Sequence, residues 1–422
     1  MGSFEDLTPD HFATLVLRHL ADVGKSVVSY DPETFRIDFV DGSKIGIRGA
    51  YYDTIRLPEP QRAASIARFL TSVGNAEHLR LPTWQEARPL LRPILRSTTD
   101  KQATADEVLH LSPEEVEEAD ARPVRRSVFP FVDELVAIDQ PNSRTVVDYS
   151  TLTRWQVTPD ELFAAARENL ETIAQPHDPR GNAILTRTDH NGHRYFTSWP
   201  LASSWLASFR QRYSGRRPVV FMPDIDTLIV VPDIPHLLAR IYRQVEQQYA
   251  NAHHRLSPQG YTLDEDDTVV PFDRAGPHEQ HQAAVRAGYR LAIQEYAAQA
   301  RWLNEALRRD LEFTRFGLEM AVVGEVKVAG TDTHPYTYTI WGKGVDYLLP
   351  AADYIIFATT DPDGKPVPHC AVPCTAALEI AGLIPIPDMS PIRFEARFWP
   401  DETMLTHLQQ ASVPLDEPTW HT

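Results

Sequence analysis

The sequence predicts an α+β fold made of several domains. The chain has 422 residues, which is long for a single hydrophobic core. Its first segment carries the pattern of a helix, three strands and a second helix, and its last part is rich in alternating strand patterns. Helical and strand patterns follow one another between these two parts, which is typical of a mixed α+β domain.

The N-terminal helix–three-strand–helix unit is expected at residues 1–95. Thr8 is a typical N-cap, and Pro9 suits the first position of a helix because the amide that it lacks has no partner there. Three short strand patterns follow, and Asp41-Gly42 predicts a tight hairpin turn between two of them. A second helical pattern closes the unit.

Composition divides the remainder of the chain into further parts. An acidic, solvated connector at 96–126 leads to a mixed α+β middle domain at 127–272. A long helix at 277–312 comes next, followed by a β-rich C-terminal domain at 313–411 and a polar tail at 412–422.

The long helix carries an apolar seam between positions 279 and 311. Its apolar residues step by threes and fours, which is the spacing of one face of a helix. Such a seam can dock a domain of the same chain or pair with a second copy of it, and the pattern leaves both open. The seam residues are Val285, Tyr289, Ile293, Tyr296, Ala300, Leu303 and Leu307.

The composition is that of a globular protein with an acidic balance. Hydrophobic residues make up 42% of the chain, and the formal net charge is −17. Phosphate backbones and anionic membrane surfaces both require a basic face, so we expect neither nucleic acid nor membrane as a partner. The chain has no apolar run of membrane-spanning length and begins without a signal-peptide pattern, which favours a cytoplasmic location.

Four stretches of the chain resemble the YtpQ-like family of uncharacterised bacterial proteins. They lie at residues 89–98, 135–139, 166–170 and 222–234, and the resemblance covers about residues 1–272. It implies a bacterial α+β protein, and it carries over no catalytic motif because the activity of the family is not established. The order of helix, three strands and helix is also similar to secretion-chaperone-like domains, which bind other polypeptides.

Asp224 and Asp226 are the candidate metal ligands. They follow the apolar run 219–222, and carboxylates at i and i+2 of a strand point to one face, where they could hold Mg²⁺ or Mn²⁺. Asp233 is a candidate third ligand. The alternative is a β-turn, in which Asp224 initiates the turn and Asp226 starts the next strand.

Tyr336, Tyr338, Trp341 and Lys343 are the candidate partner-binding residues. The aromatic residues alternate in a strand pattern, and Lys343 lies between two glycines that permit close backbone approach. Aromatic side chains beside such a loop could bind a partner or a small ligand. The alternative is a core strand that leads into a hairpin.

The two cysteines, Cys370 and Cys374, lie four positions apart beside His369. A structural zinc site needs a second ligand pair, and a redox pair has a shorter spacing. A Cys–His nucleophile needs an oxyanion partner that nothing in the sequence marks. We expect two small buried residues at a turn.

These observations predict a protein that binds another protein, as an adaptor, a chaperone-like module or an immunity-type module. The sequence presents neither a complete catalytic constellation nor a cofactor motif. The alternative is a metal-dependent enzyme that acts on nucleotides through Asp224 and Asp226. The partner that we expect is another protein or, through the helix at 279–311, a second copy of this chain.

Overall fold

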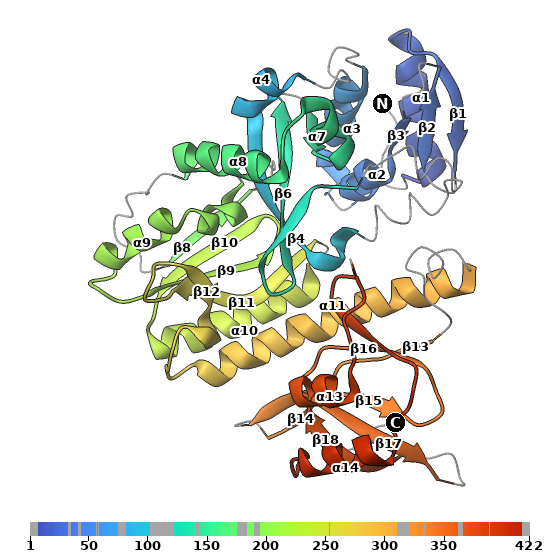
Figure 1. Ribbon diagram of the computed structural model, residues 1–422. Helices are drawn as coiled ribbons and strands as arrows, with labels where there is room; N and C mark the ends of the chain where they lie inside the picture. Colours follow the sequence, from blue (N-terminus) through green and yellow to red (C-terminus); the bar gives the residue numbers. More distant parts are fainter. Residues whose placement is uncertain are drawn as a thin grey trace. The chain divides into compact units, whose positions relative to one another are not determined.

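The computed structural model confirms an α+β fold with several separate sheets (Figure 1). The predicted turn at Asp41-Gly42, most of the acidic connector and most of the tail lie outside the residues that the structure describes. The described residues are 7–32, 35–40, 44–55, 57, 59–74, 82–101, 122–140, 143–174, 184–189, 195–252, 254–309, 321–331, 334–361, 366–387 and 389–415.

The chain divides into two compact units, each assembled from more than one stretch of sequence. Strands β4 (Leu91–Ser97) and β6 (Val132–Gln140) contribute residues to both units, so the unit boundaries differ from the predicted domain boundaries. The ends of the predicted connector at 96–126 are likewise in strands, not in solvated chain. The first unit contains Met1–Arg92, Asp106–Pro123 and Ala137–Ala166, and the second contains Pro93–Ala105, Val124–Val136 and Arg167–Thr422.

The first unit begins with the predicted helix, three strands and helix. The side chain of Thr8 accepts a hydrogen bond from the His11 amide and so caps the first helix. The strands form an antiparallel sheet in the order β1–β2–β3, and Phe12 and Ile37 are fully buried in the core beneath it. The elements are α1 (Pro9–Asp22), β1 (Val27–Asp31), β2 (Arg36–Phe39), β3 (Lys44–Gly46), α2 (Arg48–Ile55) and α3 (Glu59–Gly74).

Tryptophans anchor the rest of the first unit. The indole of Trp155 donates to the Pro82 carbonyl at 2.8 Å, and its ring packs against Trp84 with the ring centroids 5.5 Å apart. These contacts join segments that are distant in the sequence. The elements are α4 (Trp84–Ala87), η2 (Arg88–Leu90), β7 (Ser143–Val146), α7 (Tyr149–Trp155) and the first part of α8 (Pro159–Ile173).

A five-stranded antiparallel sheet with the order β12–β11–β9–β10–β8 lies at the centre of the second unit. Alternate residues of β9 enter two different cores: Val220 joins one and Phe221 the other. Because both faces of the sheet are covered, the sequences of β9 and β10 are almost continuously apolar. The strands are β8 (Leu185–Thr188), β9 (Pro218–Asp224), β10 (Thr227–Pro232), β11 (Arg255–Leu263) and β12 (Val269–Pro271).

Helices cover the two faces of this sheet. Helix α9 (Ser203–Arg212) contributes Trp205 and Phe209 to the core that contains Val220. Helix α10 (Pro235–Asn251) contributes Leu238 to the core that contains Phe221. The remaining short helices of this part are η4 (Phe196–Leu201) and η5 (Phe272–Arg274).

Helix α11 (His281–Arg309) is the predicted long helix, and its apolar seam is used inside the chain. The helix packs against α10, β11 and the C-terminal strands β13 and β15. Pairing with a second copy through this seam would have to displace those elements, so the observed packing agrees with the docking alternative, and self-pairing stays a prediction. Among the seam residues with described side chains, Tyr296 and Leu303 are buried, and Val285, Tyr289, Ile293 and Ala300 are half-buried.

The C-terminal part is β-rich, as predicted, and forms two sheets. One has the order β14–β15–β17–β18 and the other the order β13–β16–β19, with parallel pairs at β15–β17 and β13–β16. The strands are β13 (Val322–Val323), β14 (Lys327–Gly330), β15 (Pro335–Gly342), β16 (Tyr347–Pro350), β17 (Tyr354–Thr360), β18 (Pro366–Pro373) and β19 (Arg393–Ala396); the helices are α13 (Cys374–Ala381) and α14 (Glu402–Gln410).

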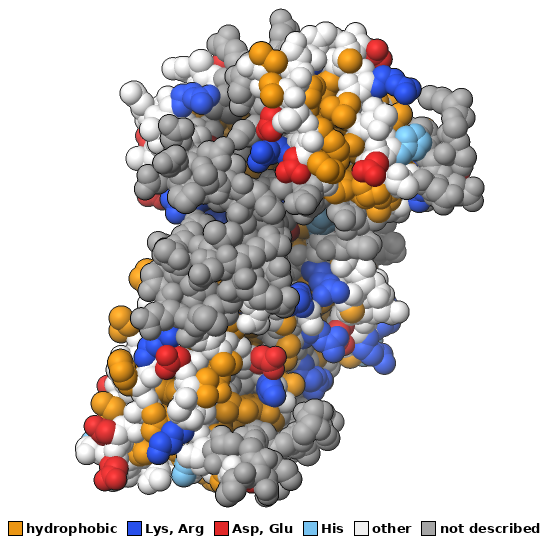
Figure 2. All heavy atoms as spheres, turned by 90° about the vertical axis from the view of Figure 1, so that its right-hand side faces the viewer, with side chains coloured by type: hydrophobic (Ala, Val, Ile, Leu, Met, Phe, Trp, Pro, Cys, Tyr) orange, Lys and Arg blue, Asp and Glu red, His pale blue; other side chains and the backbone are white. Residues whose placement is uncertain are grey.

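The surface mixes apolar and charged side chains. Figure 2 shows one face of the molecule, on which hydrophobic side chains form patches that border Lys, Arg, Asp and Glu side chains. Among the exposed large hydrophobic residues are Val28 in β1 and Val328 in β14. No helix in the described part of the chain is both long and apolar enough to cross a membrane.

Candidate functional site

Asp224 and Asp226 occupy the turn between strands β9 and β10. One carboxylate oxygen of Asp224 accepts the Asp226 amide at 2.9 Å, which is the hydrogen bond of an Asx turn. The other oxygen accepts the side-chain amide of Gln248 at 2.9 Å. Both oxygens of Asp224 therefore stabilise the turn and its contact with helix α10.

Three carboxyl groups lie close to this turn. The amide of Asp189 donates to the Asp226 carbonyl at 2.8 Å, and the Asp189 carboxylate accepts the Tyr195 amide at 3.0 Å. Burial raises the pKa of the Asp226 carboxyl, and the negative charges of Asp224 and Asp189 raise that pKa further. The turn is therefore a place where negative charge is crowded.

A surface hollow of about 430 Å³ opens beside Asp224. Helix α10 supplies nearly all of its other lining, and most of those side chains carry amides. The side-chain amides can donate and accept hydrogen bonds, and the carboxylate can accept them. The lining supplies only one formal charge, that of Asp224. The lining residues are Asp224, Gln244, Gln247, Gln248, Asn251 and Ala252.

The residues at this turn do not complete a metal site. Asp233, the candidate third ligand, accepts hydrogen bonds from Arg217 at 3.0 and 3.2 Å at the other end of strand β10. Within the described residues, no group of three or more His, Cys, Asp or Glu side chains is placed to hold a metal ion. The metal function of Asp224 and Asp226 stays a prediction, and their observed hydrogen bonds agree with the turn alternative.

The structure separates the four candidate partner-binding residues. Trp341 is 1% exposed and packs against Phe357, and Tyr338 is 4% exposed. Neither side chain can contact a partner without unfolding of the sheet, so the core alternative replaces the prediction for these two. Tyr336 is half-buried, and Lys343 is exposed after the end of strand β15.

The two edge strands of the sheet that contains β15 differ in chemistry. Strand β18 has prolines at positions 366, 368 and 373, which supply no amide to a neighbouring strand. The Val413 amide donates to the Ala371 carbonyl at 2.9 Å, so the following chain covers part of this edge. The β18 edge (Pro366–Pro373) is closed by both means.

Strand β14 forms the opposite edge and has one neighbour in the sheet, β15. The β14 edge (Lys327–Gly330) contains no proline, and Val328 is 51% exposed. Gly330 ends the strand with φ +94°, a conformation in which a Cβ atom would lie 2.3 Å from the His334 carbonyl oxygen. This position therefore requires glycine.

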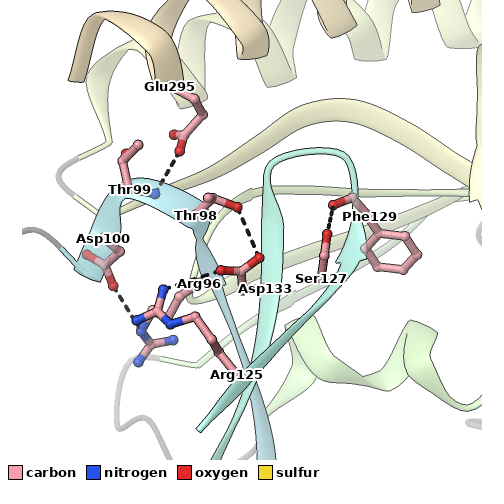
Figure 3. A network of polar contacts seen from close by, with 9 residues as sticks. All are labelled: Arg96, Thr98, Thr99, Asp100, Arg125, Ser127, Phe129, Asp133 and Glu295. Carbon is pink, nitrogen blue, oxygen red and sulfur yellow. Dashed lines mark hydrogen bonds and ion pairs between the residues drawn. The ribbon is translucent and has the colours of Figure 1, made fainter. Parts of the chain in front are cut away.

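A buried polar network lies elsewhere in the second unit, where strand β4 leads into the 3-10 helix η3 (Thr98–Lys101) (Figure 3). The Thr98 hydroxyl donates to Asp133 at 3.1 Å, and Arg125 pairs with the same carboxylate at 3.3 Å. The Thr99 amide donates to Glu295 of helix α11 at 2.9 Å. Both carboxylates are at most 4% exposed.

Two buried glutamates of the second unit have opposite surroundings. Glu134 is fully buried, and the guanidinium groups of Arg126 and Arg167 each lie 2.8 Å from its carboxylate. Within the described residues, the Glu295 carboxylate accepts hydrogen bonds from neutral donors alone. Burial raises the pKa of Glu295 from 4.5 to about 7, against the opposing effect of the Thr99 amide and of the Thr99 and Ser97 hydroxyls.

Only Cys374 is buried as predicted, whereas Cys370 lies within a strand and not at a turn. Cys374 is 7% exposed at the start of α13, and Cys370 is half-buried in β18. Burial raises the pKa of both thiols, which lowers the thiolate fraction at neutral pH.

Sequence reasoning missed Glu295, Asp133 and the β14 edge. Helical spacing offered a signal for Glu295, because Glu295 lies four positions after Leu291 and eight before Leu303 and so shares a helix face with these apolar residues. The β14 edge gives no such signal, since the sequence Lys-Val-Ala-Gly does not reveal which side of a strand lacks a neighbour.

No family model, no curated protein and no solved structure matches this chain.

Proposed function

We propose that this chain binds another protein by adding an extended segment of that protein to the β14 edge. The observation that supports the proposal is the contrast between the two edges of one sheet. Prolines and the chain that follows close the β18 edge, whereas β14 has one neighbouring strand among the described residues. An uncovered edge is a template for strand addition.

The backbone groups of Val328 point away from strand β15. The Thr337 amide of strand β15 donates to the Asp353 carboxylate at 2.7 Å. Asp353 directly precedes β17, so the Thr337 amide points toward β17 and away from β14. Thr337 is the register partner of Val328, and the two residues of an antiparallel pair either both face each other or both face outward. The Val328 amide and carbonyl are therefore available to an added strand.

The side chains of the β14 edge favour a partner strand with an apolar residue. Val328 exposes 51% of its surface beside these backbone groups, and covering it would contribute to binding. Lys327 is exposed at the start of the edge and can pair with an acidic residue of the partner. A short extended segment with one apolar and one acidic position is the ligand that we expect.

The setting that we propose is the bacterial cytoplasm, with the chain as an adaptor, a chaperone-like module or an immunity-type module. The resemblance of residues 89–98 and 222–234 to the YtpQ-like family supports a bacterial origin. The net charge of −17 supports a partner other than nucleic acid or an anionic membrane.

Site-specific photocrosslinking tests this proposal. A photoreactive amino acid replaces Val328 on the β14 edge or Val367 on the β18 edge, and the chain is expressed in its native host. Both positions are exposed, 51% for Val328 and 42% for Val367, so they are matched in access. We expect a crosslinked heteromeric product from position 328 and none above background from position 367.

The variant Val328→Pro gives the control for a strand-addition mechanism. Proline removes the outward amide, while the pairs that bond to β15 are those of Lys327 and Ala329. The crosslinked partner should then bind at least about tenfold more weakly, the loss that removal of a main-chain hydrogen bond and its apolar contact produces. Equal crosslinking at both edges, or an unchanged affinity of the partner for Val328→Pro, would contradict the proposal.

A further inference from the structure

One turn of helix α11 is polar and buried. Glu295, Tyr296 and Gln299 are 4%, 2% and 1% exposed. Buried glutamate is rare unless a cation pairs with it, and polar side chains seldom occupy the inward positions of a helix. This turn therefore has a role beyond filling space.

Glu295 holds the helix to the segment that follows strand β4. Its carboxylate accepts a hydrogen bond from the Thr99 amide at 2.9 Å (Figure 3). The hydroxyls of Thr99 and Ser97 also donate to this carboxylate and favour its charged form. Thr99 and Ser97 are themselves buried. We call Glu295, Thr99 and Ser97 the Glu295 joint.

Tyr296 and Gln299 hold the same turn to the C-terminal sheet β13–β16–β19. The Tyr296 hydroxyl donates to the Ile392 carbonyl at 2.9 Å. The Gln299 amide donates to the Pro391 carbonyl at 2.6 Å and accepts from the Arg393 guanidinium at 2.6 Å. The turn therefore connects η3 on one side to the C-terminal strands on the other.

The cations near the Glu295 joint have other partners. Arg96 of strand β4 lies 3.4 Å from Asp100 of η3, and the Asp100 charge acts against ionisation of Glu295. On the hairpin of β5 (Arg125–Phe129) and β6, Arg125 pairs with Asp133 at 3.3 Å. Neither guanidinium is left to compensate the charge of Glu295.

The same holds for the elements on the other side of the helix. Burial raises the pKa of Tyr249 of helix α10, and the Glu295 charge raises that pKa further. Arg255 of strand β11 donates to Gln294, and Arg290 of α11 pairs with Glu246 at 2.9 Å. Among the described residues, Glu295 accepts hydrogen bonds from neutral donors alone, so an ionised Glu295 is a buried charge without an ion-pair partner there.

We propose that Glu295 is a proton-operated joint, which holds helix α11 to η3 when its carboxyl is neutral and loosens that contact when the carboxyl is ionised. A neutral carboxyl still accepts the Thr99 amide and costs little to bury. An ionised carboxyl regains hydration only when the contact opens. Proton loss therefore favours the open form of the joint.

The sign of the pH dependence follows from the direction of the shift. The folded state raises the pKa of Glu295 from 4.5 to about 7, so folding and closure favour the protonated form. This contribution to closure is complete below pH 4.5 and is lost as the pH rises to about 7. The joint is tightest in mildly acidic solution and loosest above neutrality.

Hydrogen exchange of the Thr99 amide measures the joint directly, because this amide donates to Glu295. After correction for the intrinsic exchange rate, opening should become about tenfold more frequent between about pH 6 and about pH 8. Glu295→Gln keeps the acceptor for Thr99 and removes the titration, so its corrected exchange should not change with pH. Glu279→Gln, an exposed position before the helix, should behave like the unmodified chain.

The variant Asp100→Asn provides a second test, which does not require Glu295→Gln to fold. Removal of the Asp100 charge lowers the pKa of Glu295, so the midpoint of the exchange change should move to lower pH. Three outcomes would each overturn the proposal. They are pH-independent protection in the unmodified chain, a retained pH dependence in Glu295→Gln, and an unmoved midpoint in Asp100→Asn.

Discussion

The two edges of the C-terminal four-stranded sheet differ in how their backbone groups are covered. On the β18 edge, prolines at 366, 368 and 373 remove amides, and the Val413 amide occupies the Ala371 carbonyl. On the β14 edge, all four residues keep their amides, and Val328 is exposed. The prolines and the following chain thus close one edge of the sheet, whereas the other edge has no second neighbouring strand among the described residues.

Strands that are close in the sequence can therefore differ in side-chain exposure in a way that their residue types do not indicate. Strand β15 is rich in aromatic residues and its Tyr338 and Trp341 are buried, whereas its neighbour β14 has no aromatic residue and has one neighbouring strand among the described residues. Stability should therefore reside in the sheet interior and binding at the open edge.

Trp341→Ala should destabilise the second unit by about 3–5 kcal/mol, because it removes a fully buried aromatic side chain from the sheet interior. Denaturant unfolding at neutral pH measures the change as a shift of the midpoint. A loss below about 1 kcal/mol would mean that Trp341 does not belong to the core, and the partner-binding interpretation of this residue would return.

Glu295→Gln tests the support beneath the C-terminal sheets without touching either edge. At about pH 8 the variant should be more stable than the unmodified chain by up to about 3 kcal/mol, since it removes a buried uncompensated charge. At about pH 5, where Glu295 is largely protonated, the gain should fall below about 1 kcal/mol. A gain that is equal at both pH values would contradict the charge surroundings described for Glu295.

Val328→Lys and Val367→Lys compare the two edges directly. Both positions are exposed, so each change should alter the free energy of unfolding by less than about 0.5 kcal/mol. Binding of the crosslinked partner should weaken with Val328→Lys alone, because the added charge lies beside the open edge. An equal loss of binding with both variants would remove the distinction between the edges.

Asp226→Ala tests the competing site at the turn between β9 and β10. If the chain works as a binding protein, Mg²⁺ or Mn²⁺ with nucleotide should not raise the melting temperature of either the unmodified chain or the variant. A thermal shift with the unmodified chain that disappears in Asp226→Ala would instead support the metal-dependent alternative. Asp233→Asn is a matched control, since Asp233 pairs with Arg217 away from the turn.

Local patterns in the sequence predicted much of the fold. The Thr8-Pro9 start of α1 and the apolar period of α11 depend on residues close in sequence, and both elements form as predicted. Helix α14, which Asp401 caps, lies within the stretch that was predicted only as part of a β-rich domain. The unit boundaries were also missed, since a strand such as β6 shows no break in pattern where it passes between units.

The candidate sites were harder to predict because they depend on what covers each residue. Trp341 and Lys343 are two positions apart, yet one is in the core and the other is exposed. Asp224 looks like a ligand in sequence and serves as a hydrogen-bond acceptor in the turn. Glu295 owes its raised pKa to burial beneath residues almost two hundred positions away, which no local pattern contains.

Amide exchange along strand β14, measured for the free chain and for its complex with the crosslinked partner, tests whether a partner strand adds to the β14 edge. In the free chain the Val328 amide should exchange without protection, while the amides of Lys327 and Ala329 are protected by β15. Partner binding should slow exchange at Val328 and leave the β18 edge unchanged. Protection of Val328 in the free chain, or partner-induced protection that avoids β14, would contradict the account.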